Sequence, residues 1–244
     1  PECRPFLTRP VPHVAGRHEV EQNLRLIEAG CQVEGMPCPI AEIDKTLAFP
    51  LSEEEKAFAD NYLARHGLVS HSHLVAIHPG AGAAVKLWPA ERFAQVADAL
   101  AERWKARIIL TGSRAELGLA WAVAMRTGAL VAAGETTLGQ LAALLARCDL
   151  VIGSDSGPLH LAVAVGAPTI HLYGPANPAL FGPWAPGSEG AHRAIVSPMA
   201  CVPCNRLDYT MAELVSHTCM KEITVAEVLK AAEELLGLRQ RDLS

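Results

Sequence analysis

A short polar turn, Gly153-Ser154-Asp155-Ser156-Gly157-Pro158-Leu159-His160, carries the residues best suited to chemistry in this 244-residue chain. The apolar run before it is typical of a buried strand, and the apolar run after it predicts a helix. A strand, a tight turn and a helix start direct backbone N–H groups and the positive end of a helix dipole at one point, which suits an anion. Asp155 and His160 would lie beside that point. The alternative is an ordinary capped helix start, with Ser156 or Asp155 as cap and Pro158 in the first turn.

Strands and helices alternate regularly around this turn. Short runs rich in β-branched residues predict strands at residues 74–77, 107–110, 129–132, 148–152, 169–173 and 193–196. Helical periodicity predicts intervening helices, which include residues 89–105 and 115–126 and a helix capped by Thr137 with Gln140. This alternation implies right-handed βαβ units and a parallel sheet. We therefore predict an α/β fold, a six-stranded, doubly wound, Rossmann-like domain.

The two ends of the chain are less regular. Amphipathic helices are predicted at residues 17–30, 52–67 and 224–237, with the first and the last ending at Gly30 and Gly237. Residue 1 is Pro rather than Met, and the first 50 residues contain seven prolines and little around their one helix. We expect residues 1–50 to be the remnant of an earlier domain with a linker, and residues 51–244 to form the Rossmann-like domain.

The residues that follow each strand form a single candidate site, because ligands of such sheets bind beyond the carboxyl ends of the strands. After the first strand, Gly80 and Gly82 allow a ligand close to the backbone, and Lys86 adds a cation. After the second strand, Glu116 either stabilises a helix start or accepts hydrogen bonds from the hydroxyls of a ribose. Neither G-x-G-x-x-G nor a P-loop occurs, which argues against a dehydrogenase.

Two further strand ends complete this pattern. Gly134-Glu135-Thr136-Thr137 follows the third strand and offers backbone groups, with Thr137 as a helix cap. Tyr173-Gly174-Pro175 follows the fifth. Each of these turns alone is most simply an ordinary turn or cap. Five consecutive strand ends with small or polar residues together indicate a site for an anionic ligand.

Several of these motifs also give the chain a resemblance to a known family. In order, they are Lys86-Leu87-Trp88-Pro89, Gly134-Glu135-Thr136-Thr137, Asp155-Ser156-Gly157-Pro158-Leu159-His160-Leu161-Ala162, Gly166-Ala167-Pro168 and Tyr173-Gly174-Pro175. Together they resemble the carboxyl half of glycosyltransferase family 9, the heptosyltransferases, which add heptose from ADP-heptose to the inner core of lipopolysaccharide. The resemblance covers residues 74–235 well and residues 1–50 more loosely. It implies the GT-B fold, two Rossmann-like domains facing a cleft, of which the second binds the nucleotide sugar.

The resemblance also implies a role for each matching residue around the nucleotide. Lys86 would contact the phosphate or sugar side of the donor, and Gly82 would contact the pyrophosphate through its backbone. Glu116 would hold the ribose hydroxyls, and Thr136 the adenine through main-chain contacts. The family often has hydroxyl residues near Ala81 and Gly82, so their absence here leaves only backbone donors.

At the polar turn, the resemblance implies that Asp155 binds the heptose hydroxyls while Ser156, Gly157 and His160 hold the pyrophosphate. It further implies an inverting, metal-independent transfer that uses no cofactor, and the chain has no D-x-D metal motif. A leaving diphosphate must then be stabilised by the helix start, Lys86 and a protonated His160. We therefore expect Lys86, Asp155 and His160 to act in catalysis, with no metal in the site.

The acceptor also requires a general base. By resemblance that base is an aspartate near the beginning of the first domain, which this sequence does not contain. We therefore expect the chain to bind a donor without transferring its sugar. The lipopolysaccharide core or a lipid-linked acceptor would be recognised by the missing first domain.

Composition limits the remaining function classes. The formal net charge is -5 without a basic stripe, which argues against a nucleic-acid partner. There is no apolar run of about 18 residues and no signal-peptide pattern. Seven cysteines spread through an Ala- and Leu-rich chain do not form a secreted disulfide framework, so we expect a cytoplasmic protein. Peripheral contact with the cytoplasmic face of the inner membrane remains open.

One cluster lies outside the candidate site. Cys201 and Cys204 have C-x-x-C spacing, and His217 and Cys219 follow downstream. These residue types suit zinc, but packed or redox-labile thiols are the simpler interpretation.

Two alternative functions remain open. The chain could serve another nucleotide sugar, in a different transferase or a GT-B-like epimerase. It could also be a non-catalytic nucleotide-binding module.

Overall fold

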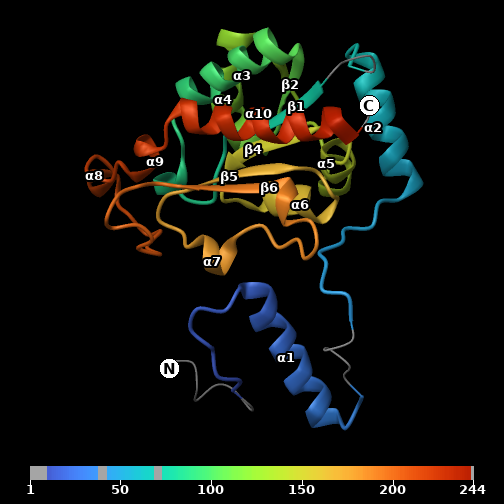
Figure 1. The fold of residues 1–244 in the computed structure, drawn as a ribbon, viewed down its shortest axis with the longest axis vertical. Coiled ribbons are helices and arrows are strands. Elements are labelled where there is room, and N and C mark those ends of the chain that lie inside the picture. The colour runs from blue at the N-terminus through green and yellow to red at the C-terminus, as the bar shows by residue number, and fades with distance from the viewer. Residues whose placement is uncertain (1–9, 38–42, 69–72, 243–244) are drawn as a thin grey trace.

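The computed structural model describes residues 10–37, 43–68 and 73–242. At its centre, six parallel strands form one sheet in the order β3-β2-β1-β4-β5-β6 (Figure 1). The strands are β1 (His73–His78), β2 (Ala106–Leu110), β3 (Leu130–Val131), β4 (Leu150–Ser154), β5 (Thr169–Tyr173) and β6 (His192–Val196). The order reverses between β1 and β4, as in Rossmann-like domains. The predicted six-stranded, doubly wound α/β fold is therefore confirmed.

Helices cover both faces of the sheet. One face packs against α3 (Ala90–Trp104), α4 (Leu117–Thr127) and α10 (Val225–Asp242), and the other against α2 (Glu53–Arg65), α5 (Leu138–Leu145) and α6 (Gly157–Ala164). Short helices lie outside these layers, α7 (Pro178–Phe181), α8 (Met211–Leu214) and α9 (Cys219–Glu222), with 3-10 turns at η2 (Ala84–Lys86), η3 (Arg114–Glu116) and η4 (Glu189–Ala191). Among the helices described, none is long and apolar enough to cross a membrane.

The core follows from the alternation of side chains along each strand. In β1, Val75 and Ile77 are buried against one helical layer, whereas Leu74 and Ala76 are buried against the other. Both sheet faces are thus apolar, which is the usual pattern of a parallel sheet covered on both sides. The carboxyl ends of the strands remain available for a ligand.

The polar turn differs slightly from its prediction. Strand β4 extends to Ser154, two residues beyond the predicted end, and α6 begins at Gly157. Gly153 therefore lies within the strand, where a Cβ would be 2.6 Å from Leu159 Cδ2 and 2.8 Å from the carbonyl oxygen of His78. A residue without a side chain is required because α6 and β1 both approach the backbone here.

Both predicted glycine stops are wrong. The first helix, α1 (Glu19–Glu34), continues through Gly30 and ends at Gly35, which has a left-handed φ of 64°. Helix α10 similarly continues through Gly237. The predicted capping boxes are confirmed, with Ser52 and Glu55 at α2 and Thr137 and Gln140 at α5.

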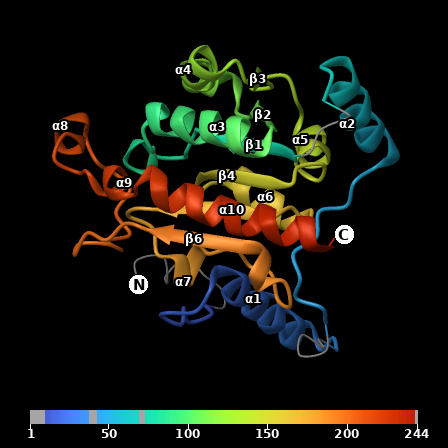
Figure 2. The same cartoon turned by 45° about the horizontal axis from the view of Figure 1, so that its top comes forward.

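The amino-terminal segment contacts the loop that follows α7. His18 caps α1 through its Nδ1, and its Nε2 donates to the carbonyl oxygen of Gly182 at 3.0 Å. The His18 ring also lies 4.7 Å from that of Trp184, whose Nε1 donates to the carbonyl oxygen of Lys45. Figure 2 shows α1 beside α7, separate from the layers around the sheet. The division at residue 50 stays a prediction, and residues 1–9 and 38–42 lie outside the described residues.

Candidate functional site

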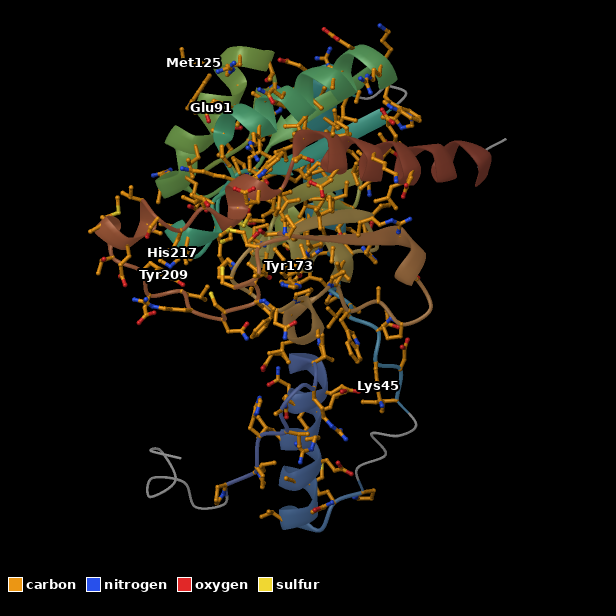
Figure 3. All side chains as sticks on the ribbon, turned by 60° about the vertical axis from the view of Figure 1, so that its left-hand side comes forward. Lys45, Glu91, Met125, Tyr173, Tyr209 and His217 are labelled. Carbon is orange, nitrogen blue, oxygen red and sulfur yellow. The ribbon has the colours of Figure 1, made fainter. Side chains whose placement is uncertain are left out.

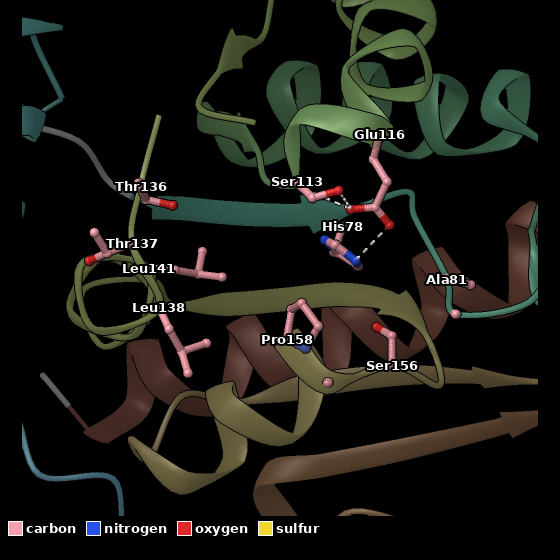
Figure 4. Close-up of a pocket in the computed structure, with 13 residues that line it drawn as sticks. His78, Ala81, Ser113, Glu116, Thr136, Thr137, Leu138, Leu141, Ser156 and Pro158 are labelled. Carbon is pink, nitrogen blue, oxygen red and sulfur yellow. Dashed lines mark hydrogen bonds and ion pairs between the residues drawn. The ribbon is translucent and has the colours of Figure 1, made fainter. Parts of the chain in front are cut away.

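A cavity of about 390 Å³ opens at the carboxyl ends of the strands (Figure 4). It is lined by His78, Ala81, Gly82, Gly112, Ser113, Glu116, Thr136, Thr137, Leu138, Leu141, Ser156, Gly157 and Pro158. These residues come from the end of β1, from the turns after β1, β2, β3 and β4, and from the first turns of α5 and α6. The cavity thus contains Gly82, Glu116, Thr136, Ser156 and Gly157, which the sequence predicted to lie together.

Glu116 is held firmly in its wall. Its Oε2 accepts hydrogen bonds from the backbone N–H of Ser113 at 2.7 Å and from the Ser113 hydroxyl at 2.8 Å. Its other oxygen contacts the backbone at Gly80, where a Cβ would collide with Oε1. The carboxylate therefore acts as a cap through one oxygen and keeps the other at the cavity.

His78 completes this wall, although no role was predicted for it. Its side chain is only 3% exposed, and its Nδ1 lies 3.2 Å from the Thr111 hydroxyl. Burial lowers the pKa of His78 and outweighs the opposing effect of Glu116, which favours the neutral imidazole. The signal that could have identified His78 is its position as the last residue of the first strand.

Lys86, Asp155 and His160 form a second, adjoining cluster. Lys86 Nζ lies 2.7 Å from Asp155 Oδ2, and His160 Nε2 lies 3.2 Å from Asp155 Oδ1. Burial raises the pKa of Asp155, but hydrogen bonds from His160 and Lys86 outweigh it and hold the pKa below its usual value. The carboxylate therefore stays ionised and positions two potential cations at the start of α6.

The start of α6 offers mostly backbone groups. Ser156 is its N-cap residue, but its side chain makes no capping hydrogen bond. The Ser156 hydroxyl is buried and has no hydrogen-bond partner among the described residues, although Ser156 lines the cavity. Ser156 therefore occupies the cap position that the sequence allowed, but its hydroxyl does not make the capping hydrogen bond and has no partner among the described residues.

The opposite wall comes from the turn before α5. Thr136 lines the cavity, and Thr137 caps the helix by accepting a hydrogen bond from the backbone N–H of Gln140. Leu138 and Leu141 add an apolar surface that the sequence analysis did not identify. Their positions one turn apart on a helix that starts at the site could have indicated it.

Behind His160, strand β5 carries a buried polar row. The ring of His171 lies 5.4 Å from that of His160, and its Nε2 is 2.9 Å from the hydroxyl of Thr169. That hydroxyl is also 2.9 Å from His192 Nδ1. Burial, and then the nearby His160 and His192, lower the pKa of His171 to about 3. His171 is thus a neutral support beneath the cluster.

The cysteine cluster lies in a different place. Cys201, Cys204, His217 and Cys219 line a separate cavity of about 150 Å³. Tyr209, another lining residue, has its ring 3.9 Å from that of His217 (Figure 3). In the part of the chain that the structure describes, no three His, Cys, Asp or Glu side chains form a group that could hold a metal ion. The five cysteines described there form no disulfide.

The family can now be tested by comparison with known proteins. The model of glycosyltransferase family 9 (heptosyltransferase) matches residues 3–210. The chain belongs to this family. The resemblance seen in the sequence motifs is therefore confirmed.

Individual relatives agree with this assignment. Lipopolysaccharide heptosyltransferase 3 of Escherichia coli K12 is 30% identical over 70% of this chain and 48% of its own length. Lipopolysaccharide heptosyltransferase 1 of Pseudomonas aeruginosa is 30% identical over 82% of this chain and 50% of its own length. The chain thus spans about half the length of the curated relatives it matches.

Solved structures share the fold. A glycosyl transferase family 9 protein from Veillonella parvula has a TM-score of 0.74 and 29% identity, covering 96% of this chain and 64% of its own. The E. coli ADP-heptose lipopolysaccharide heptosyltransferase II has a TM-score of 0.65 over 85% of this chain and 57% of its own, and at 24% identity it shows the fold alone. The predicted Rossmann-like half of a GT-B fold is confirmed.

Proposed function

We propose that this chain is the donor-binding part of a heptosyltransferase, which binds ADP-heptose for transfer of heptose to the lipopolysaccharide core. The names of the matching relatives support the sugar and the acceptor class. The observation that carries the proposal is the cavity itself. It joins an apolar wall, a carboxylate and a helix start, which suit a base, a ribose and a diphosphate in turn.

The donor lies in this cavity with its adenine against Leu138, Leu141 and the main chain of Thr136. Glu116 accepts hydrogen bonds from the ribose. The diphosphate binds at the backbone of Gly82 and at the start of α6, where Ser156 and Gly157 line the cavity. The sugar is directed toward Asp155 at the end of β4.

Lys86 and His160 stabilise the leaving diphosphate. Both are already held by Asp155, so the Lys86 ammonium and the His160 imidazole are in place before the bond to the sugar breaks. Preorganised cations of this kind allow an inverting transfer without a metal ion or cofactor. Asp155 has a double role, since it positions both cations and accepts hydrogen bonds from the sugar hydroxyls.

The acceptor base is an aspartate of a preceding domain, so the residues present here bind the donor without completing the transfer. The lipopolysaccharide acceptor is bound between the two domains. A cytoplasmic location, with peripheral contact at the inner membrane, fits a lipid-linked acceptor.

A direct experiment removes the positive charge of Lys86. We expect Lys86→Met to weaken ADP binding about tenfold to a hundredfold in the presence of EDTA, because a charge-assisted hydrogen bond to the diphosphate is lost. Lys56→Met is the matched control, because Lys56 pairs with Glu53 on the surface of α2. Isothermal titration calorimetry measures both. Equal affinity of wild type and Lys86→Met would favour a vestigial nucleotide-binding module instead.

The same protein tests the expected lack of transfer. We expect this chain to bind ADP-heptose and to leave a heptose-deficient lipopolysaccharide acceptor unmodified over hours. Mass spectrometry of the acceptor measures the product. Heptose transfer by the chain alone would show that the base lies among these 244 residues.

A further inference from the structure

His78 and Glu116 face each other across a gap at the cavity wall. Nε2 of His78 lies 3.8 Å from Oε1 of Glu116, which is too long for a hydrogen bond. Both residues line the cavity, and Figure 4 shows the Glu116 side chain from η3 directed toward His78 at the end of β1. The gap between them therefore lies at the wall of the cavity.

The protein holds both sides of this gap. Glu116 Oε2 is fixed by the two hydrogen bonds from Ser113, and the imidazole of His78 is buried with Nδ1 near the Thr111 hydroxyl. Closing the gap would require Glu116 to leave its cap or His78 to leave Thr111. The separation of 3.8 Å is thus a property of the folded site.

The nearby carboxylate determines which ring nitrogen of His78 carries the proton. An N–H facing an anion is favoured over a lone pair, so we assign the proton to Nε2. Nδ1 then accepts a hydrogen bond from the hydroxyl of Thr111. The two sides of the gap consequently present one donor, His78 Nε2–H, and one acceptor, Glu116 Oε1.

A single hydroxyl group matches this arrangement. An oxygen about 2.8 Å from both atoms fits between them, accepting from Nε2–H and donating to Oε1. A methylene group can do neither. We propose that His78 and Glu116 together bind one ribose hydroxyl of the nucleotide, and that His78 makes the site select ribonucleotides over deoxyribonucleotides. This inference rests on the proposed function and adds a specificity-determining residue to it.

Selectivity for ribonucleotides follows because a deoxynucleotide lacks the hydroxyl group that both side chains would bind. Without the hydroxyl, a buried N–H and a carboxylate oxygen both lose their partner, and such sites reject the analogue strongly. We expect wild type to bind either 2′-deoxy-ADP or 3′-deoxy-ADP at least tenfold more weakly than ADP.

Three substitutions of His78 isolate the Nε2–H donor. His78→Gln places an amide N–H near the position of Nε2, whereas the shorter His78→Asn reaches only toward Thr111, and His78→Phe keeps a ring without nitrogen. We expect His78→Gln to retain the preference for ADP over the sensitive deoxy analogue. His78→Asn and His78→Phe should bind ADP about as weakly as wild type binds that analogue, with the preference lost.

The experiment is a calorimetric titration of ADP, 2′-deoxy-ADP and 3′-deoxy-ADP into wild type and the three variants, each first checked by thermal unfolding. His66→Gln, an exposed residue outside the cavity, is the control. Equal affinity of wild type for all three nucleotides overturns the inference without reference to any variant. An unchanged preference in folded His78→Asn or His78→Phe also overturns it. Failure of wild type to bind ADP would instead refute the proposed function itself.

Discussion

At the scale of single residues, the site depends on side chains that are each held by more than one group. Asp155 contacts Lys86 with one oxygen and His160 with the other, so under the proposed function the sugar would share a carboxylate that already has two partners. His160 in turn lies over His171. The charged side chains of the site are therefore held in place by charged and by neutral neighbours. Because some of these neighbours are histidines, we expect the free energy of unfolding to depend on pH.

His171 provides the clearest pH dependence. In the unfolded chain a histidine takes up a proton below about pH 6.5, whereas buried His171 stays neutral down to a pKa of about 3. Between these values the unfolded state binds more protons, so the free energy of unfolding decreases as the pH falls below about 6.5. At pH 5 one such histidine lowers the free energy of unfolding by about 2 kcal/mol.

The variant His171→Leu tests this sign. We expect its loss of stability between pH 7.5 and pH 5 to be smaller than that of wild type by about 2 kcal/mol, measured by urea unfolding. The exposed His13→Gln should lose as much stability as wild type. A larger loss in His171→Leu than in wild type would contradict a neutral, buried His171.

At the scale of elements, the site depends on how closely α6 approaches the ends of β1 and β4. Gly153 permits this contact, because a Cβ there would meet both the Leu159 side chain and the carbonyl oxygen of His78. The backbone at His78 also positions the imidazole in the cavity wall. Packing of α6 and geometry of the site are thus determined by the same glycine.

We expect Gly153→Ala to destabilise the fold by roughly 1–3 kcal/mol, because backbone atoms must move to accommodate the methyl group. Gly118→Ala in α4 is the matched control, since a Cβ there meets no atom within 4 Å. That change should be stabilising by about 0.5–1 kcal/mol through helix propensity. Urea unfolding of both variants gives the comparison, and equal stability of the two would show that the close approach is unimportant.

Local patterns predicted the elements well and their ends less well. Short runs rich in β-branched residues identified all six strands, and the capping boxes placed the starts of α2 and α5 correctly. Gly30 and Gly237 were mistaken for helix ends, because glycine ends a helix only where the chain adopts a left-handed φ, as at Gly35. Sequence alone does not show which glycine does so.

The candidate site could also be predicted in part from the sequence. Parallel strands bring their carboxyl ends to one edge, so Gly82, Glu116, Thr136, Ser156 and Gly157 could be placed together before the structure was known. The hydrogen-bond and ion-pair partners of the side chains could not be predicted from the sequence. That the Ser156 hydroxyl makes no cap, and that His78 faces Glu116, depends on distances between separate turns.

At the scale of the whole molecule, the six-stranded sheet carries a cavity of about 390 Å³ at the carboxyl ends of its strands. The apolar side, with Leu138 and Leu141, lies at one end and the Lys86–Asp155–His160 cluster adjoins the other. The chain spans about half the length of the curated relatives it matches. Under the proposed function, this cavity determines which donor binds.

The central claim is therefore that this cavity is an ADP site, and one titration tests it most directly. Wild-type protein is titrated with ADP, GDP and UDP in the presence of EDTA, at one pH and one ionic strength. Main-chain contacts at Thr136 and the flat apolar wall should favour adenine, so we expect ADP to bind at least tenfold more tightly than GDP or UDP. Equal or tighter binding of UDP or GDP would contradict the account.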